Sequence, residues 1–262
     1  MGYDVKNVRP KKHLGQHFLK DKAVAIRIVN SLTGFGDYEH VVEVGPGTGV
    51  LTEILLAENK FTWWGVEVDT ESIVFLRQKF PEAVNRIIEQ DFLASDLSTL
   101  FDAPKLAVIG NFPYNISSQI LFKVLENKDK VTEMVGMFQK EVAQRVVAGP
   151  GGRVNGILSI LCQAFYHIDY LFEVEPGVFN PPPKVKSAVI RFRRNDVEAL
   201  DCDEKKFFRV VKTAFNQRRK TLRNSLKVSG IQWDEFDIAD LSGKRAEELT
   251  VQQFVQITNA AR

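Results

Sequence analysis

Residues 40–59, HVVEVGPGTGVLTEILLAEN, contain the pattern that indicates the fold. The apolar run at 40–45 predicts a buried strand, and residues 48–59 have the periodicity of an amphipathic helix. Three glycines, Gly45, Gly47 and Gly49, lie between them. A glycine-rich turn at the carboxyl end of a strand lets a ligand approach the backbone closely. The stretch therefore predicts a strand–turn–helix unit with a ligand site at its turn, although an ordinary structural turn is the alternative.

The same alternation of strand and helix continues along the chain. Pro81 ends the second predicted helix, and the break GPGGR at 149–153 ends the last helix of the series. Strands and helices that alternate at these lengths predict an α/β fold whose mostly parallel sheet is covered on both faces. The further predicted strands are 61–69, 85–91, 105–111 and 132–139, and the further helices are 70–80, 117–127 and 140–148.

The pattern changes after residue 153. A helix at 156–166 is followed by two predicted strands, 167–175 and 187–194, which only the short Pro-rich link PGVFNPPPK separates. Two strands without a crossover helix pair antiparallel, so we expect an antiparallel edge on the parallel sheet. Everything past Asn195 has a helical pattern, with Phe208, Val211 and Phe215 on one face. We therefore predict two domains, 1–194 and a small all-helical domain at 195–262.

Composition limits the class of protein. No stretch of the 262 residues has the roughly 18 consecutive apolar residues of a membrane span, and the polar, basic N-terminus lacks the apolar core of a secretory signal. Cys162 and Cys202 stand far apart without a CxxC pair, and the four histidines lack metal-ligand spacing. These features predict a cytoplasmic protein without a metal or a membrane association. The absence of a sustained heptad pattern leads us to expect a monomer.

Positive charge is concentrated in three regions although the net charge is only +2. Residues 205–227 contain nine Lys or Arg and no acid, a second cluster spans 184–194, and the N-terminal arm holds the third. A single run of this kind is usually a solvated helix face, but three runs favour a nucleic-acid partner. The candidate RNA contacts are Lys11, Lys12, Lys184, Arg218, Arg219, Lys220 and Arg223.

The turn at 45–49 lacks the phosphate-binding patterns. A dinucleotide fingerprint requires glycine where the chain has Val50, and the P-loop sequence GK[ST] is absent. Glu67 ends the next strand, where a carboxylate can accept hydrogen bonds from both ribose hydroxyls. The alternative role for Glu67 is that of a helix-capping acid, but Asp69 fits that role better. Asp91 ends the third strand, in position to accept from an adenine amine. Together these strand ends predict that S-adenosylmethionine binds along the carboxyl edge of the sheet.

The fourth strand is followed by NFPYN at 111–115. The exocyclic amine of adenine is a poor nucleophile because its lone pair is delocalised into the ring. The Asn111 side-chain oxygen and a nearby backbone carbonyl can accept its two N–H bonds, and Pro113 makes the turn rigid. Tyr114 and Phe112 are expected to be exposed, with Tyr114 offering a face on which an extruded base stacks. Aligning the amine with a sulfonium methyl group then allows direct transfer, largely by positioning. Phe179 is either a second stacking ring or a core residue.

Eight motifs follow one another along nearly the whole sequence: KKHLGQHFL (11–19), EVGPGTGVLT, VEVD, QDF, NFPYNISS, FQKEVAQRV, FNPPPKVKSAV and AFNQRRKTLRNSL (214–226). In these motifs, and in their order, the chain resembles the KsgA family of ribosomal RNA adenine dimethyltransferases.

The resemblance implies a class I, Rossmann-like methyltransferase fold with a helical C-terminal domain. It also implies dimethylation of two adjacent adenosines near the 3′ end of 16S rRNA, in a pre-ribosomal particle of the small subunit. By motif, Asn111, Tyr114 and Phe179 would frame the target base. The implied cofactor contacts are His17, Leu19, Gly45, Gly47, Glu67, Asp91 and Asn111.

Two residues depart from the family pattern. The family usually has Asn where this chain has His17, which puts that cofactor contact in doubt, and Phe112 replaces a more common Leu or Ile. An Erm-type methyltransferase of large-subunit rRNA shares the cofactor motifs, but segments 11–19 and 214–226 favour the KsgA family. A binding factor that has lost catalysis is a further alternative, against which the intact Asn111 and Tyr114 argue. A nicotinamide oxidoreductase is excluded by Val50 and by the lack of a proton-donating group of residues.

Overall fold

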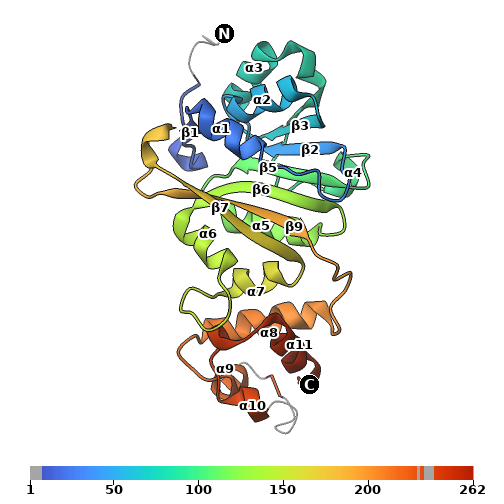
Figure 1. The fold of residues 1–262 in the computed structure, drawn as a ribbon, viewed down its shortest axis with the longest axis vertical. Coiled ribbons are helices and arrows are strands. Elements are labelled where there is room, and N and C mark those ends of the chain that lie inside the picture. Colours follow the sequence, from blue (N-terminus) through green and yellow to red (C-terminus); the bar gives the residue numbers. More distant parts are fainter. Residues whose placement is uncertain (1–7, 229–230, 233–238, 262) are drawn as a thin grey trace. The chain divides into compact units, whose positions relative to one another are not determined.

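The computed structural model describes residues 8–228, 231–232 and 239–261 (Figure 1). The chain forms two compact units, one of residues 1–143 with 169–194 and the other of residues 144–168 with 195–262. Residues 144–168 lie inside the predicted domain 1–194, yet they group with the C-terminal helices. The chain therefore passes from the first unit to the second, returns, and passes over again after residue 194.

A sheet of seven described strands forms the centre of the first unit, in the order β4-β3-β2-β5-β6-β9-β7 (Figure 1). The neighbours from β4 to β6 pair in parallel, whereas β9 runs antiparallel to β6. This arrangement confirms the predicted α/β class with an antiparallel strand on one side of the sheet. The strands are β2 (His40–Val44), β3 (Thr62–Glu67), β4 (Ile87–Glu89), β5 (Leu106–Asn111), β6 (Val131–Gln139), β7 (Tyr166–Val174) and β9 (Ser187–Arg194).

Helices cover the sheet because its strands are apolar on both sides. Val41 and Trp63 point to one face, where they join a buried cluster with Ile28 of α1, Leu55 of α2 and Leu76 of α3. The alternate strand residues are buried as well, which is typical of a parallel sheet covered on both faces. The helices of this unit are α1 (Lys22–Val29), α2 (Val50–Glu58), α3 (Thr70–Lys79), α4 (Leu97–Leu100), α5 (Ser117–Glu126) and the start of α6 (Lys140–Val147), with 3₁₀ turns η2 (Pro81–Arg86) and η3 (Pro176–Val178).

The N-terminal arm is joined to the link between β7 and β9. After the 3₁₀ turn η1 (Lys12–Leu14), the short strand β1 (Phe18–Leu19) pairs antiparallel with β8 (Phe179–Asn180). Leu19 lies opposite Phe179 in this pairing. Two motifs that stand far apart in the sequence are thereby brought together beside the main sheet.

The second unit is helical in its described residues beyond 195. Helix α8 buries Phe207, Val210, Val211, Ala214 and Phe215, and its Phe215 ring stacks on Phe254 of α11 at 5.9 Å between centroids. The predicted apolar face is thus correct for Val211 and Phe215, whereas Phe208 is half-buried. The elements are α7 (Ile157–Gln163), α8 (Glu204–Asn216), α9 (Leu222–Val228), α10 (Ala239–Ser242), η4 (Ala246–Glu248) and α11 (Val251–Ala260).

Candidate active site

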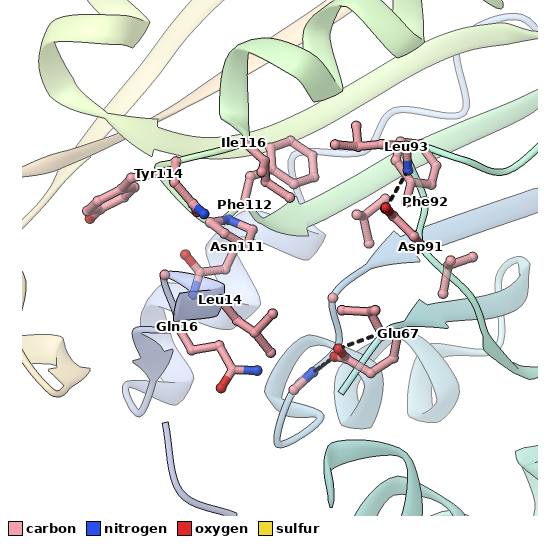
Figure 2. Close-up of a pocket in the computed structure, with 18 of the residues that line it drawn as sticks. Leu14, Gln16, Glu67, Asp91, Phe92, Leu93, Asn111, Phe112, Tyr114 and Ile116 are labelled. Atoms are coloured by element: carbon pink, nitrogen blue, oxygen red, sulfur yellow. Dashed lines mark hydrogen bonds between the residues drawn. The ribbon is translucent and has the colours of Figure 1, made fainter. Parts of the chain in front are cut away.

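A cavity of about 290 Å³ opens at the carboxyl edge of the parallel strands, entirely within the first unit. One wall consists of the ends of β2, β3, β4 and β5, and the other consists of the N-terminal segment 13–18. Figure 2 shows Glu67 and Asp91 on the strand side and Leu14 and Gln16 on the other. A mostly apolar lining with a few converging polar groups is typical of a small-molecule site.

The glycine-rich turn forms the floor of this cavity. Gly45 has φ +67° and Gly47 has φ +56°, a region that favours glycine. A Cβ on Gly45 would meet no atom within 4 Å, so the backbone there is open to a ligand. A Cβ on Gly47 would lie 2.8 Å from the ring of Phe18, so that glycine lets the N-terminal segment close over the turn.

Glu67 is held by three main-chain N–H groups. Gly47 donates to its Oε2 at 2.9 Å (Figure 2). Val68 and Asp69 donate to its Oε1 at 2.9 and 3.0 Å. Burial raises the pKa of this carboxyl group, and the three hydrogen bonds oppose that rise. The carboxylate is therefore fixed in orientation at the cavity wall.

Glu43 is a second buried acid, which the motif analysis did not single out. Its Oε2 accepts from the Thr52 hydroxyl at 2.7 Å and from the Trp63 indole N–H at 2.8 Å. Burial raises the pKa of Glu43 to about 7. The residue ties the strand before the glycine-rich turn to the helix after it. A charged residue inside a predicted buried strand is the signal that would have identified it.

Asp91 lies at the cavity wall, exposed, just past the end of β4. Its Oδ1 accepts from the Leu93 N–H at 2.9 Å, which fixes the turn that follows (Figure 2). Its neighbours Phe92 and Leu93 line the same part of the cavity. The strand ends thus bring Gly45, Glu67 and Asp91 to one ligand-sized space.

Asn111 lies at the end of β5, where its side-chain NH₂ donates to the main-chain carbonyl of His17 at 2.8 Å. A carbonyl oxygen only accepts hydrogen bonds, so this contact identifies which end of the amide is nitrogen. The amide oxygen is consequently the end left to accept from a ligand. An acceptor at this position suits an amine whose N–H bonds must be oriented.

Tyr114 is anchored at both its hydroxyl and its ring. The hydroxyl lies 2.6 Å from the Ser187 hydroxyl, and the ring stacks on the His17 imidazole at 5.5 Å between centroids. Burial raises the pKa of the tyrosine. His17 Nδ1 lies 2.7 Å from the carbonyl oxygen of Pro181 and therefore donates to it. The imidazole thus connects the turn after β5 to the loop after β8.

The expectation that Phe112 is exposed is wrong. Its ring is 1% exposed and packs edge-on against Phe138 at 5.2 Å. Gly110 and Gly136 face each other across β5 and β6, and a Cβ on either would clash with the Phe112 ring. The two glycines form a hollow in the sheet that the ring fills. Phe112 therefore anchors the turn from below, and although it borders the cavity, its ring is too buried for a base to stack on.

Two other predicted contacts have their side chains in the core. Leu19 and Phe179 are 4% and 1% exposed and belong to one buried cluster, and neither is among the residues that line the cavity. Of the two alternatives for Phe179, the core position is the one observed. Phe18, the residue before Leu19 in the short strand β1, lines the cavity instead, because successive side chains of a strand point to opposite faces.

The candidate RNA contacts differ in their surroundings. Lys11 forms ion pairs with Asp69 and Glu71, and Arg218 donates to the carbonyl oxygens of Arg153 and Asn155, so both charges are already engaged. The remaining candidates, all exposed, are Lys12, Lys184, Arg219, Lys220 and Arg223.

Gln16 and Asp69 are two further polar residues at the site that the sequence analysis did not select as functional candidates. Gln16 lines the cavity and donates to Asp69 Oδ2 at 3.4 Å. The glutamine belongs to the motif GQHFL, and the aspartate follows Glu67 by two residues. Over the part of the chain that the structure describes, no group of acidic, His or Cys side chains could hold a metal ion, and no helix is long and apolar enough to cross a membrane.

Comparison with protein families gives a match over residues 7–262 to the model of the family described as ribosomal RNA adenine dimethylase. The chain is 52% identical over 255 residues to the ribosomal RNA small subunit methyltransferase A of Cytophaga hutchinsonii, covering 97% of this chain and 98% of the relative. It is 54% identical over 256 residues to the protein of the same name from Bacteroides thetaiotaomicron, covering 97% and 95%.

Solved structures with a similar fold include a dimethyladenosine transferase from Plasmodium falciparum, with a TM-score of 0.76 at 22% identity over 94% of this chain and 99% of that one. The 23S rRNA methyltransferase ErmE matches with a TM-score of 0.70 at 22% identity, over 93% and 98%. At this level of identity the likeness concerns the fold, which is that of class I methyltransferases.

Proposed function

The chain belongs to the ribosomal RNA adenine dimethylase family, and from this premise we propose that it dimethylates the N6 amines of two adjacent adenosines near the 3′ end of 16S rRNA, with S-adenosylmethionine as methyl donor. The observation that carries the proposal is the hydrogen bond between Asn111 and the His17 carbonyl. It presents the amide oxygen at a cavity of nucleoside size, as an adenine amine requires.

The residues that line the cavity fit the methyl donor. We propose that Glu67 accepts from the ribose hydroxyls, since its carboxylate is already oriented by three N–H groups. Asp91 would accept from the adenine amine of the cofactor, and the open backbone at Gly45 leaves room for the rest of the molecule. S-Adenosylmethionine supplies an electrophilic methyl group on a sulfonium ion.

The chain contributes positioning rather than a strong base. The Asn111 oxygen accepts one N–H of the target amine, and a nearby main-chain carbonyl is proposed to accept the other. Two acceptors fix the direction of the nitrogen lone pair, and this orientation accounts for a large part of the rate. The methylated ammonium is acidic and loses its proton to solvent readily, so a second methyl transfer can use the same two acceptors.

Tyr114 is proposed to stack on the extruded base. Its hydroxyl contact with Ser187 and its stacking on His17 set the plane of the ring. Stacking on an aromatic ring contributes about 1–3 kcal/mol per base. The implied role of Phe179 becomes indirect: its core position supports β8, which pairs with the segment that carries His17.

The relatives bear names that refer to the small ribosomal subunit, and we propose small-subunit rRNA as the partner of this chain too. The exposed lysines and arginines at Lys12, Lys184, Arg219, Lys220 and Arg223 are the proposed phosphate contacts. A pre-ribosomal particle as the true substrate, a monomeric enzyme and a cytoplasmic location remain predictions within this proposal.

The test uses radiolabelled S-adenosylmethionine with small and large ribosomal subunits from a strain that lacks this activity. Nucleosides from the digested rRNA are identified by mass, and Asn111→Ala serves as the inactive control. We expect dimethyladenosine in small-subunit rRNA alone, and its loss in the variant.

Label in large-subunit rRNA instead would mean the specificity of an Erm-type enzyme. Absence of label in both subunits, with RNA binding intact, would contradict the catalytic proposal and leave a binding factor with a methyltransferase fold.

A further inference from the structure

We propose that Asp69 is a positioning residue of the cofactor site, whose carboxylate holds the segment Lys11–Phe18 closed against the cavity through Lys11 and Gln16. This inference rests on the proposed function in one respect, that the cavity binds S-adenosylmethionine. Neither Asp69 nor Lys11 lines the cavity, so Asp69 acts through Gln16, which does, and through the turn that the Lys11 N–H closes on Gln16.

The segment Lys11–Phe18, called the strap below, is held together by its own hydrogen bonds. The N–H groups of Leu14 and Gly15 donate to the carbonyl oxygens of Lys11 and Lys12 at 3.1 and 3.0 Å. The Lys11 N–H donates to Gln16 Oε1 at 2.9 Å. Because these bonds close a compact turn, an attachment at one point positions the whole strap.

The strap forms one entire wall of the cavity. Its six consecutive residues 13–18 line the space, opposite Glu67 and Asp91 (Figure 2). Three contacts fix its far side: Phe18 packs over Gly47, Gly15 packs against Asn115, and the His17 carbonyl accepts from Asn111. A ligand between strap and strand ends is therefore enclosed only while the strap stays in place.

Asp69 holds the near side of the strap. Its Oδ1 pairs with Lys11 Nζ, and its Oδ2 accepts from Gln16 Nε2 at 3.4 Å and from the Ser72 hydroxyl at 2.7 Å. Glu71 adds a second carboxylate 3.4 Å from Lys11. The Asp69 side chain is 1% exposed and that of Lys11 is 28% exposed. An ion pair shielded in this way is screened by salt less than a surface pair.

The main chain of Asp69 points to the opposite wall. Its N–H donates to Glu67 Oε1 at 3.0 Å, so the residue that retains the strap also orients the carboxylate proposed to bind ribose. One residue thus connects both walls of the cavity. Cofactor binding and strap closure then stabilise each other, and loss of the Asp69 side chain should weaken binding without removing any group that touches the ligand.

The test measures S-adenosylhomocysteine binding to the full chain by calorimetry, and its dissociation rate by stopped flow, for Asp69→Asn, Lys11→Met and the double variant. We expect the dissociation constant to rise about tenfold in each single variant, the size expected for one charge-assisted hydrogen bond. The double variant should be no weaker than the worse single variant, because both remove the same contact. Lys11→Arg should restore most of the affinity.

The pair Lys22–Glu53 provides a matched control. It is also a Lys–carboxylate contact, at 2.7 Å, but its side chains are 71% and 41% exposed. Lys22→Met should leave the dissociation constant within about twofold, as expected for a surface ion pair. Hydrogen exchange gives a second readout: in Asp69→Asn the amides of residues 14–16 should exchange faster, while those of the central strands stay protected.

Equal affinity and equal exchange at residues 14–16 in wild type and Asp69→Asn would overturn the inference. Faster exchange over the whole sheet would overturn it too, since that result means general destabilisation. Failure of the proposed function is a distinct result, because the wild-type chain itself would then bind no S-adenosylhomocysteine.

Discussion

The side-chain amide of Asn111 and the main-chain carbonyl of His17 are joined by a hydrogen bond of 2.8 Å that connects the turn after β5 to the N-terminal arm. The bond determines the orientation of the amide, which a strand end alone leaves free to rotate. The group proposed to accept the target amine is therefore set by a residue far away in the sequence. Replacing the amide nitrogen alone, with the side-chain oxygen kept, should therefore impair methyl transfer.

Asn111→Asp should lower kcat for rRNA methylation by about 10²–10³-fold, the usual cost of losing one preorganised polar group in an active site. The aspartate keeps the acceptor oxygen and the size of the side chain but cannot donate to the His17 carbonyl, and its charge is repelled by that oxygen. Single-turnover rates at saturating rRNA measure the effect. A rate within tenfold of wild type would show that the donor function of Asn111 is dispensable.

Gly136→Ala should destabilise the protein by about 1–3 kcal/mol, the typical cost of overpacking a core. The new methyl group would clash with the rings of both Phe112 and Phe138, and Phe112 also anchors the turn that carries Asn111 and Tyr114. We expect both the free energy of unfolding in urea and kcat to fall.

The double variant Gly136→Ala with Phe112→Leu tests that cause. Leucine is smaller than phenylalanine and removes the clash at position 112 but not the one with Phe138, so it should recover part of the stability that Gly136→Ala loses. If Phe112→Leu worsens the loss instead, the hollow formed by Gly110 and Gly136 does not serve to hold this ring.

The residues at the strand ends could be predicted from the sequence because the sheet topology alone determines where they lie. Once the alternation of strands and helices indicates a parallel sheet, the residues that follow each strand must meet at one edge. Glu67, Asp91 and Asn111 lie at such ends, and the structure brings all three to the cavity. No knowledge of side-chain packing is needed for that inference.

What could not be predicted depends on pairing between distant segments. The composition of NFPYN is that of a turn and predicts an exposed Phe112, whereas the space that the ring fills arises from the register of Gly110 with Gly136. The pairing of β1 with β8 likewise places Leu19 and Phe179 in the core. A basic residue such as Lys11 looks the same in sequence whether its partner is a phosphate or a carboxylate.

Arg218 and Lys220 offer a direct test of that last distinction. Arg218 donates to the carbonyl oxygens of Arg153 and Asn155 within the second unit, whereas Lys220 is exposed. Arg218→Met should lower the melting temperature by about 2–4 °C, as a loss of about 1 kcal/mol would. Lys220→Met should leave the melting temperature unchanged and weaken RNA binding, with a smaller dependence of log Kd on log salt concentration.

Calorimetry and RNA-binding titrations between low and moderate salt measure these two effects. Unchanged melting of Arg218→Met would mean that its carbonyl contacts contribute nothing to folding. An unchanged salt slope for Lys220→Met would remove that lysine from the proposed phosphate contacts.

Glu43→Gln should alter how stability depends on pH. Burial raises the pKa of Glu43 from 4.5 to about 7 in the folded protein. Between pH 4.5 and pH 7, Glu43 is therefore mostly protonated in the folded state and mostly ionised in the unfolded state. Stability contributed by this group is therefore lost as pH rises from about 4.5 through 7, and above pH 7 the buried charge costs about 3 kcal/mol. The carboxamide oxygen that the substitution introduces can still accept from Thr52 and Trp63, since both donate to the same oxygen of Glu43.

The Glu43→Gln variant should therefore equal wild type near pH 4.5 and exceed it in stability at pH 8. Urea unfolding at several pH values measures the difference, with the exposed Glu82→Gln as a control for the general loss of one negative charge. If Glu43→Gln is instead less stable than wild type at pH 8, the charged carboxylate stabilises the glycine-rich turn, and its hydrogen bonds from Thr52 and Trp63 outweigh the cost of burial.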